Sequence, residues 1–250
     1  WNQILAEHRF KDAEKSFRLL NQFANGPGFV HVSERTSELA MQLVPKLLAL
    51  CRPPSGQPGS KPETRNAKLQ HKILSDPDRV LARLDSFTPA YGARAMMFET
   101  WAANPQIFEL LLLLFDRSEF LAEIAIRTPD LVDELVISGR LRKSKSAEEI
   151  LQDLRHGRDD ADQRLWLRRY HQAEFMRIGL RSILGLADYE QNFLELSALA
   201  DACLQYALDV AFRKLVLKAS PLVIIGLGKL GGRELNYGSD LDILFVAEDK

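Results

Sequence analysis

Two aspartates near the end of the chain, Asp240 and Asp242, are the residues whose type and spacing most clearly suggest chemistry. They lie at the start of the apolar run Leu241–Val246, which predicts a β-strand. Residues two apart in a strand share a face, so both carboxylates would point the same way, roughly 6–7 Å apart. Two ionised carboxylates at about 6 Å repel by about 3 kcal/mol at an effective dielectric of about 20. Because a divalent cation would offset that repulsion and Mg²⁺ prefers hard oxygen ligands, we predict that both are catalytic metal ligands.

Glycines precede this acidic pair and predict a phosphate-binding turn. Gly231 and Gly232 follow the apolar run Leu222–Ile225, and consecutive free amides at a strand-to-helix turn can bind phosphate oxygens. Ser239 adds a hydroxyl beside the first aspartate, and Lys229 is placed to reach a phosphate from the loop. Taken singly, such features are often a solvated turn or a structural loop. Their combination favours a nucleotide site, with one wall for a triphosphate and another for its Mg²⁺, and in-line phosphoryl chemistry needs little more than that.

A competing motif occupies the same stretch. Gly226, Gly228 and Gly231 match the spacing of the dinucleotide-binding fingerprint. That fingerprint requires a continuous helix of about a dozen residues after the loop. Here Asn236–Gly238 leaves room for barely two turns, and the acidic pair begins the next strand instead of ending one. The dinucleotide interpretation is therefore the less favoured one.

The elements that must position these residues are predicted to be mainly helical. We expect a helical segment over 1–51, a linker over 52–64 rich in proline, glycine and serine, and a helical connector domain over 65–219. At Ser220-Pro221 the composition changes to β-branched runs, and 220–250 is predicted to be the N-terminal part of a nucleotidyltransferase domain. The predicted fold class is therefore mainly α, a helical bundle followed by the beginning of an α/β domain with a mixed sheet.

Helix starts are marked by capping patterns. A cap residue or asparagine comes before proline at Asp76-Pro77 and Asn104-Pro105, and Thr128–Asp130 predicts a further start. Ser146 and Glu149 have capping-box spacing. Two long amphipathic stretches between about 161 and 218 are expected to break near 185–189.

Composition excludes little but sets limits. The chain has 250 residues, a net charge of −1 and two cysteines, so neither a nucleic-acid nor a membrane partner is indicated and a reduced, cytoplasmic setting is expected. The apolar run Leu110–Phe115 has six residues, whereas a bilayer needs roughly 20.

The stretch Gly228–Phe245 resembles the signature of the glutamine-synthetase adenylyltransferase family, a branch of the polymerase-beta-like nucleotidyltransferases. It reads Gly-Lys-Leu-Gly-Gly-Arg-Glu-Leu-Asn-Tyr-Gly-Ser-Asp-Leu-Asp-Ile-Leu-Phe, and most of its eighteen positions fit the signature. Upstream segments also resemble the family's helical connector, and the resemblance is weakest over residues 1–63. Those upstream segments are Gly92–Ala95, Ala103–Pro105, Phe120–Glu123, Pro129–Leu135 and Leu167–Ile178.

The resemblance implies an ATP- and Mg²⁺-dependent enzyme that transfers AMP to a tyrosine of glutamine synthetase, and removes it through a second copy of the domain. It implies that Asp240 and Asp242 bind the metal and that Gly231, Gly232 and Ser239 face the triphosphate. The chain fits the connector plus the opening of the adenylylating copy. A third carboxylate of the superfamily would lie on a later strand, so we expect this polypeptide to be inactive alone. Glutamine synthetase and the PII signal protein are the implied partners, in nitrogen regulation.

Two other functions remain open. The helices over 65–219 would serve as a non-catalytic platform for glutamine synthetase or PII, or the chain would belong to another polymerase-beta-like enzyme acting on RNA or an antibiotic. The long helical region argues against the latter. Five arginines of the long helical stretch are predicted to form a solvated face with local ion pairs, and His171 a satisfied or surface position. These arginines are Arg164, Arg168, Arg169, Arg177 and Arg181.

Overall fold

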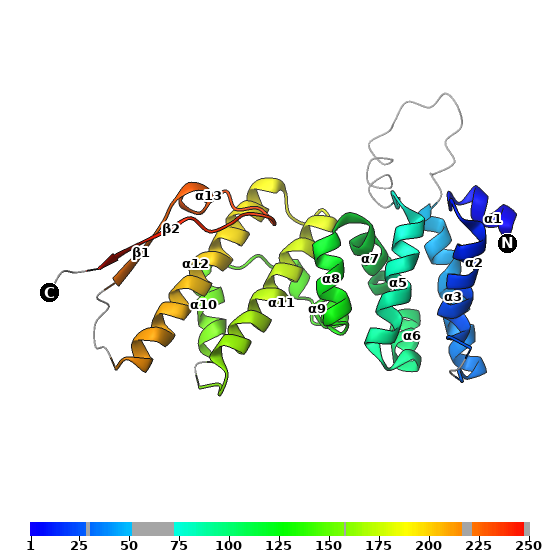
Figure 1. Ribbon diagram of the computed structural model, residues 1–250, viewed down its shortest axis with the longest axis horizontal. Helices are drawn as coiled ribbons and strands as arrows, with labels where there is room; N and C mark the ends of the chain where they lie inside the picture. The colour runs from blue at the N-terminus through cyan, green and yellow to red at the C-terminus, as the bar shows by residue number, and fades with distance from the viewer. Residues whose placement is uncertain (29–30, 52–72, 158, 217–221, 248–250) are drawn as a thin grey trace, which may run out of the picture. The chain divides into compact units, whose positions relative to one another are not determined.

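The computed structural model describes residues 1–28, 31–51, 73–157, 159–216 and 222–247. The described chain is mainly helical and ends in two short strands, which confirms the predicted fold class (Figure 1). The predicted linker over 52–64 lies outside the described residues. The chain forms two compact units, Trp1–Ile137 and Ser138–Lys250.

The packing units begin and end at other places than the predicted domains. Helices from both sides of the predicted linker pack against one another in the first unit, where α2 (Ala13–Asn25) contacts α5 (Pro77–Tyr91) and α3 (Glu34–Cys51) contacts α6 (Arg94–Ala103). The second unit begins inside the predicted connector. The predicted domain limits are a statement about the family's organisation and stay predictions.

The first unit is built from helices whose starts follow the predicted capping patterns. Asp76 caps α5 by accepting a hydrogen bond from the Arg79 N–H, and Pro77 is the first helical residue. A carboxylate from another helix completes this start, because Asp116 accepts hydrogen bonds from the Ser75 and Asp76 N–H groups at 2.9 and 3.0 Å. The remaining helices of this unit are α1 (Asn2–Glu7), α7 (Pro105–Arg117), α8 (Glu119–Arg127) and α9 (Leu131–Ile137).

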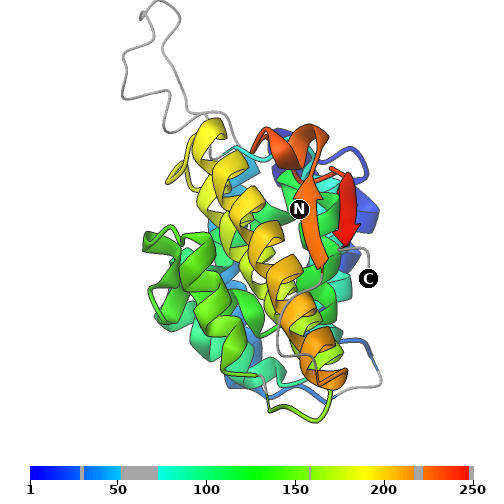
Figure 2. The same ribbon diagram turned by 90° about the vertical axis from the view of Figure 1, so that its left-hand side faces the viewer.

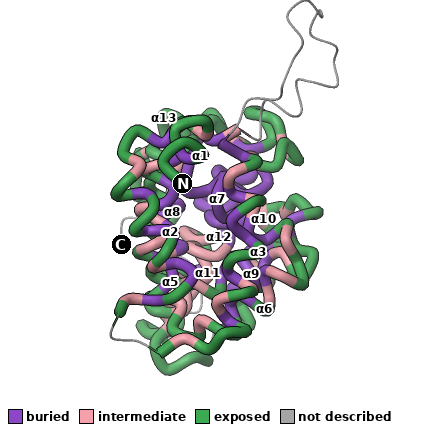
Figure 3. Tube along the Cα trace, turned by 90° about the vertical axis from the view of Figure 1, so that its right-hand side faces the viewer, coloured by how far each residue is buried: buried purple, intermediate pink, exposed green. Residues whose placement is uncertain are grey.

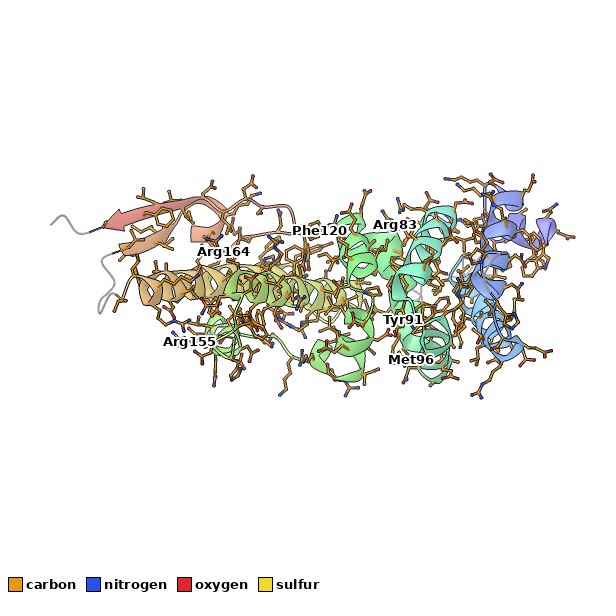
Figure 4. The ribbon with its side chains drawn as sticks, turned by 60° about the horizontal axis from the view of Figure 1, so that its bottom comes forward. Arg83, Tyr91, Met96, Phe120, Arg155 and Arg164 are labelled. Carbon is orange, nitrogen blue, oxygen red and sulfur yellow. The ribbon has the colours of Figure 1, made fainter. Side chains whose placement is uncertain are left out.

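Aromatic side chains fill the core of the first unit. Trp101 is fully buried, with ring centroids 5.2 Å from Phe108 and 5.9 Å from Phe87. Figure 3 shows buried positions gathered where these helices face one another. Asp133 is a buried carboxylate at the edge of this cluster, and the hydroxyl of Tyr91, labelled in Figure 4, donates to it at 2.7 Å. Burial raises the pKa of Asp133, and the hydrogen bonds from Tyr91 and Trp101 oppose that rise.

The second unit is a group of helices followed by a strand–turn–strand segment. Both predicted features of its helices are present: Ser146 and Glu149 form a capping box, and the two long helices break between Ile183 and Tyr189. Figure 2 shows the strands beside α12. The elements are η1 (Arg140–Arg142), α10 (Ala147–Arg155), α11 (Gln163–Ile183), α12 (Tyr189–Lys214), β1 (Leu222–Gly226), α13 (Gly228–Gly231) and β2 (Ile243–Ala247).

The two strands pair antiparallel, from Leu222 opposite Ala247 to Gly226 opposite Ile243. β1 confirms the predicted strand. β2 begins at Ile243 and not at Leu241 as predicted, because β1 ends at Gly226 and the chain then turns into α13, leaving no partner for a longer ladder. The acidic pair therefore lies just before β2, in extended chain outside the ladder.

Two of the five arginines contradict the prediction of a solvated face. Arg164, Arg168 and Arg169 are exposed, but the Arg177 side chain is fully buried and Arg181 is 5% exposed. Arg177 donates to Glu174 at 2.8 Å and to Glu195 of α12 at 2.9 Å. The partners of these arginines lie partly on α12 and η1, so their burial depends on tertiary contacts that the spacing within α11 does not reveal.

His171 is half-buried, with its ring 5.6 Å from that of Phe175, and burial lowers its pKa. A half-buried ring in contact with Phe175 agrees with the prediction of a satisfied histidine. Of the helices in the described ranges, none has both the length and the apolar character needed to cross a membrane.

Candidate active site

The predicted phosphate-binding turn is the connection from β1 to α13, and its glycines have separate structural reasons. A Cβ on Gly231 would lie 2.6 Å from the Gly226 carbonyl oxygen, so only glycine allows the backbone to approach β1 this closely. A Cβ on Gly232 would lie 3.4 Å or more from its neighbours, and that position is exposed. The Gly231 and Gly232 N–H groups donate to the Leu227 and Gly228 carbonyls at 2.9 and 3.0 Å, so the prediction of free amides at these two glycines is wrong: the short helix α13 already uses them. Gly231 shapes the turn, and Gly232 is exposed at the surface.

The acidic pair reaches this turn through Asp242. The Leu227 N–H donates to the Asp242 carbonyl at 2.8 Å, one step beyond the β-ladder. The Asp242 carboxylate packs on Gly228, where a Cβ would lie 2.6 Å from Oδ2. Gly228 also has a φ of +51°, a conformation that favours glycine. The structure thus brings Asp242 and the Gly228–Gly232 turn together at one place.

Ser239 lies in the loop directly before the acidic pair, where its side chain shapes a tight turn. Its hydroxyl donates to the Asn236 side-chain oxygen at 2.9 Å and accepts from the Asn236 N–H at 3.1 Å. Such side chain-to-backbone bonds are typical of short turns. The predicted contact of Ser239 with a triphosphate stays a prediction.

The remaining predicted site residues are open to solvent. Lys229, in the first turn of α13, and both Asp240 and Asp242 are exposed. Within the described ranges, no group of three or more histidines, cysteines or acids is placed to hold a metal ion. The two carboxylates can offer hard oxygen ligands to a divalent cation.

Residues that sequence reasoning missed connect this loop to the helices. Leu235 is 4% exposed, and its N–H donates to the Ser197 hydroxyl of α12 at 3.4 Å. The Tyr237 ring packs edge-on against Phe175 of α11, with centroids 5.3 Å apart. The partial burial of Tyr237 raises its pKa to about 12, and a hydrogen bond with Ser182 opposes the rise. The alternation of Arg233, Leu235 and Tyr237 was the available signal, because it predicts one face of extended chain.

Comparison with known proteins shows which family this chain belongs to. A family model described as glutamate-ammonia ligase adenylyltransferase matches residues 108–250, which include the turn and the acidic pair. The chain belongs to the glutamate-ammonia ligase adenylyltransferase family. This match confirms the resemblance that the Gly228–Phe245 stretch indicated.

Individual members of the glutamate-ammonia ligase adenylyltransferase family agree. A bifunctional glutamine synthetase adenylyltransferase/adenylyl-removing enzyme of Pseudomonas aeruginosa is 31% identical over 97% of this chain, and one of Thioalkalivibrio sulfidiphilus is 28% identical over 97%. One of Nitrosococcus oceani is 35% identical over 54% of the chain. The alignments cover 24%, 25% and 16% of these relatives, so the chain spans about a quarter of their length at most.

Proposed function

We propose that this chain is part of a longer adenylyltransferase and carries one wall of its nucleotide site. In this proposal the enzyme transfers AMP from ATP to a tyrosine of glutamine synthetase, and a second copy of the domain removes it. The proposal is supported by the family match, by the names of the relatives and by the small share of their length that the chain spans. The expected inactivity of the isolated chain follows from the same proposal.

One observation carries the proposed chemistry: an exposed carboxylate, Asp242, packs directly on the glycine turn that would bind phosphate. Asp240 lies two residues earlier in extended chain and is exposed as well. Carboxylate oxygens are the ligands that Mg²⁺ prefers, so the residues present fit this ion. When bound, Mg²⁺ supplies charge neutralisation for the phosphate oxygens.

The other residues of the turn have simpler roles in the proposal. The exposed surface at Gly232 leaves room for a triphosphate to approach the turn, and Lys229 and Ser239 contribute a cation and a hydroxyl beside it. Gly231 shapes the turn so that these groups lie next to Asp242. The chain thereby binds and orients the nucleotide, which is the larger part of catalysis in phosphoryl transfer.

An AMP-transfer assay tests the proposal. The native polypeptide that contains this chain should label glutamine synthetase with AMP from ATP in the presence of Mg²⁺. Asp240→Asn and Asp242→Asn should each reduce the rate by more than about 100-fold, because loss of a metal ligand exceeds the usual effect of residues around a metal site. Glu190→Gln, at an exposed acid of α12, is the matched control and should retain full activity. Full activity of both aspartate variants would overturn the assignment.

The finer partners are proposals of the same kind. Glutamine synthetase is named in the relatives' descriptions, and we extend it to this chain as the acceptor. The PII signal protein and a cytoplasmic setting are supported by the sequence resemblance alone. The described helices of residues 73–216 are the surface on which such a partner would bind.

A further inference from the structure

The segment between the glycine turn and the acidic pair is anchored on the helices of the second unit. Leu235 is buried and its N–H donates to Ser197 of α12, and the Tyr237 ring, which is 37% exposed, packs on Phe175 of α11. Arg233, Glu234 and Asn236 are exposed. We call the segment Arg233–Tyr237 the strap.

The first contact of the strap lies at the end of α13. Arg233 and Asp201 of α12 line the same cleft of about 480 Å³. Partial burial raises the pKa of Asp201, and the charge of Arg233 opposes that rise. Arg233 and Asp201 thus face the same cleft where the strap begins.

The backbone at Arg233 takes a conformation that usually favours glycine. Arg233 has a φ of +57°, and the Arg233 and Glu234 N–H groups donate to the Leu230 and Lys229 carbonyls. This hydrogen-bond pattern ends many helices, usually with glycine in the left-handed position. A residue with a Cβ costs roughly 1–2 kcal/mol there, so the contacts around the strap must offset that strain.

The second contact is made by the strap's backbone. The buried Leu235 N–H donates to the Ser197 hydroxyl, and Ser197 lies one helical turn before Asp201 on α12. One turn of helix spans about 5.4 Å and two residues of extended chain about 6.6 Å. The spacing of Ser197 and Asp201 on α12 thus places both near the strap, Ser197 at Leu235 and Asp201 in the cleft that Arg233 also lines.

The third contact lies closest to the acidic pair. Tyr237 packs on Phe175 and hydrogen-bonds to Ser182, which in turn accepts from the Asn192 amide at 3.1 Å. Both partners of Tyr237 lie on α11, and α12 supports the contact through Asn192. Tyr237 lies within the Asn236–Ser239 turn, which leads into Asp240.

We propose that the strap sets the position of the metal-binding segment, with Tyr237 as a positioning residue for Asp240 and Asp242. The inference rests on the proposed function for its consequence in binding, but not for the contacts themselves. Tyr237 touches neither metal nor nucleotide in this account. It acts by fixing the chain three residues before the first aspartate.

Hydrogen exchange on the 250-residue chain tests the positioning without any ligand. Tyr237→Ala should speed exchange of the amides of residues 238–243 by about tenfold or more, because local opening becomes easier. Tyr237→Phe keeps the ring contact with Phe175 and should stay close to wild type. Tyr189→Ala is the control, since Tyr189 is 82% exposed on α12. Unchanged exchange in Tyr237→Ala would contradict the proposal that Tyr237 fixes the position of this segment.

Calorimetry with Mg²⁺ and ATP tests the consequence for the site. Tyr237→Ala should weaken binding by about 10- to 100-fold, the usual effect of losing a residue that supports metal ligands, and Tyr237→Phe should restore most of it. Equal affinity of Tyr237→Ala and wild type would contradict the positioning role. If the native polypeptide that contains this chain binds no nucleotide, the proposed function fails, while faster exchange in Tyr237→Ala would still support the strap. Should Tyr237→Ala unfold, Ser197→Ala, which removes the acceptor of the Leu235 N–H, replaces it in both measurements.

Discussion

The helices and the segment Leu222–Ala247 differ in how far their apolar side chains are buried. In the helices, Leu84, Trp101 and Leu112 are fully buried. On one face of the β1–β2 sheet, four apolar side chains are between 43% and 59% exposed: Val223, Ile225, Leu244 and Val246. A two-stranded sheet is marginally stable by itself in water. The proposed chemistry therefore lies in the part of the chain with the smallest core of its own.

This contrast separates stability from positioning. The helices obtain their stability from buried side chains that have no part in the proposed site. The segment around the acidic pair is held by a few contacts, chiefly Leu230, Leu235 and Tyr237. Substitutions in the two regions should consequently change different observables, and the predictions below compare them in order of decreasing effect.

The largest effect is expected from the buried charges of the helices. Arg177→Ala leaves Glu174 and Glu195 without their shared cation and should lower the free energy of unfolding by about 3–5 kcal/mol. Arg164→Ala, at the exposed arginine of α11 labelled in Figure 4, should change it by about 0.5 kcal/mol or less. Urea unfolding followed by circular dichroism measures both. Similar values for the two variants would mean that the buried network contributes nothing.

A pair of leucines compares the two regions directly. Leu111→Ala removes a side chain that is 1% exposed in α7 and should cost about 2–5 kcal/mol of unfolding free energy. Leu244→Ala removes one that is 50% exposed in β2 and should cost about 0.5 kcal/mol or less. The same urea titration compares them. A loss at Leu244 as large as that at Leu111 would show that the exposed sheet face is covered in solution.

Adjacent glycines test the geometry of the turn. Gly231→Ala forces a Cβ against the Gly226 carbonyl and should cost about 1–3 kcal/mol, mostly as local loosening of the turn. Gly232→Ala meets no such obstacle and should be nearly neutral for stability. Limited proteolysis between residues 222 and 247 reports the difference, with helix melting as the internal control. Equal resistance of both variants would show that the close approach at Gly231 does not shape the turn.

The smallest effect concerns pH and the buried Asp133 of the first unit. Its pKa is raised in the folded state, so protonation favours folding. This contribution is complete below the unfolded pKa of about 4 and is lost as pH rises through the folded value. Asp133→Asn should therefore gain stability relative to wild type as pH rises from about 4 towards 7. Unfolding titrations at a series of pH values check this sign, and a constant difference would contradict it.

Local patterns predicted local structure well. The Asp76-Pro77 start, the Ser146 and Glu149 capping box and the strand at Leu222–Gly226 depend on neighbouring residues, and all three are present. These features could be predicted because each depends on interactions between residues that are close in sequence.

Features that depend on contacts between residues far apart in the sequence could not be predicted in the same way. The burial of Arg177 depends on Glu195 of the next helix, and the late start of β2 depends on where β1 ends. The contacts of Tyr237 likewise involve α11, more than fifty residues earlier in the chain. For the candidate site, the sequence identified the residue types, but only the structure shows that the Asp242 carboxylate packs on Gly228.

The most direct test of the account is the titration of the native polypeptide that contains this chain with Mg²⁺ and ATP in a calorimeter. We predict nucleotide binding that requires Mg²⁺ and that the combined substitution of Asp240→Asn and Asp242→Asn weakens strongly, while urea stability of the helices stays at the wild-type value. Full binding by this double variant, or no binding by the wild-type polypeptide, would contradict the claim that the acidic pair and the glycine turn belong to a nucleotide site.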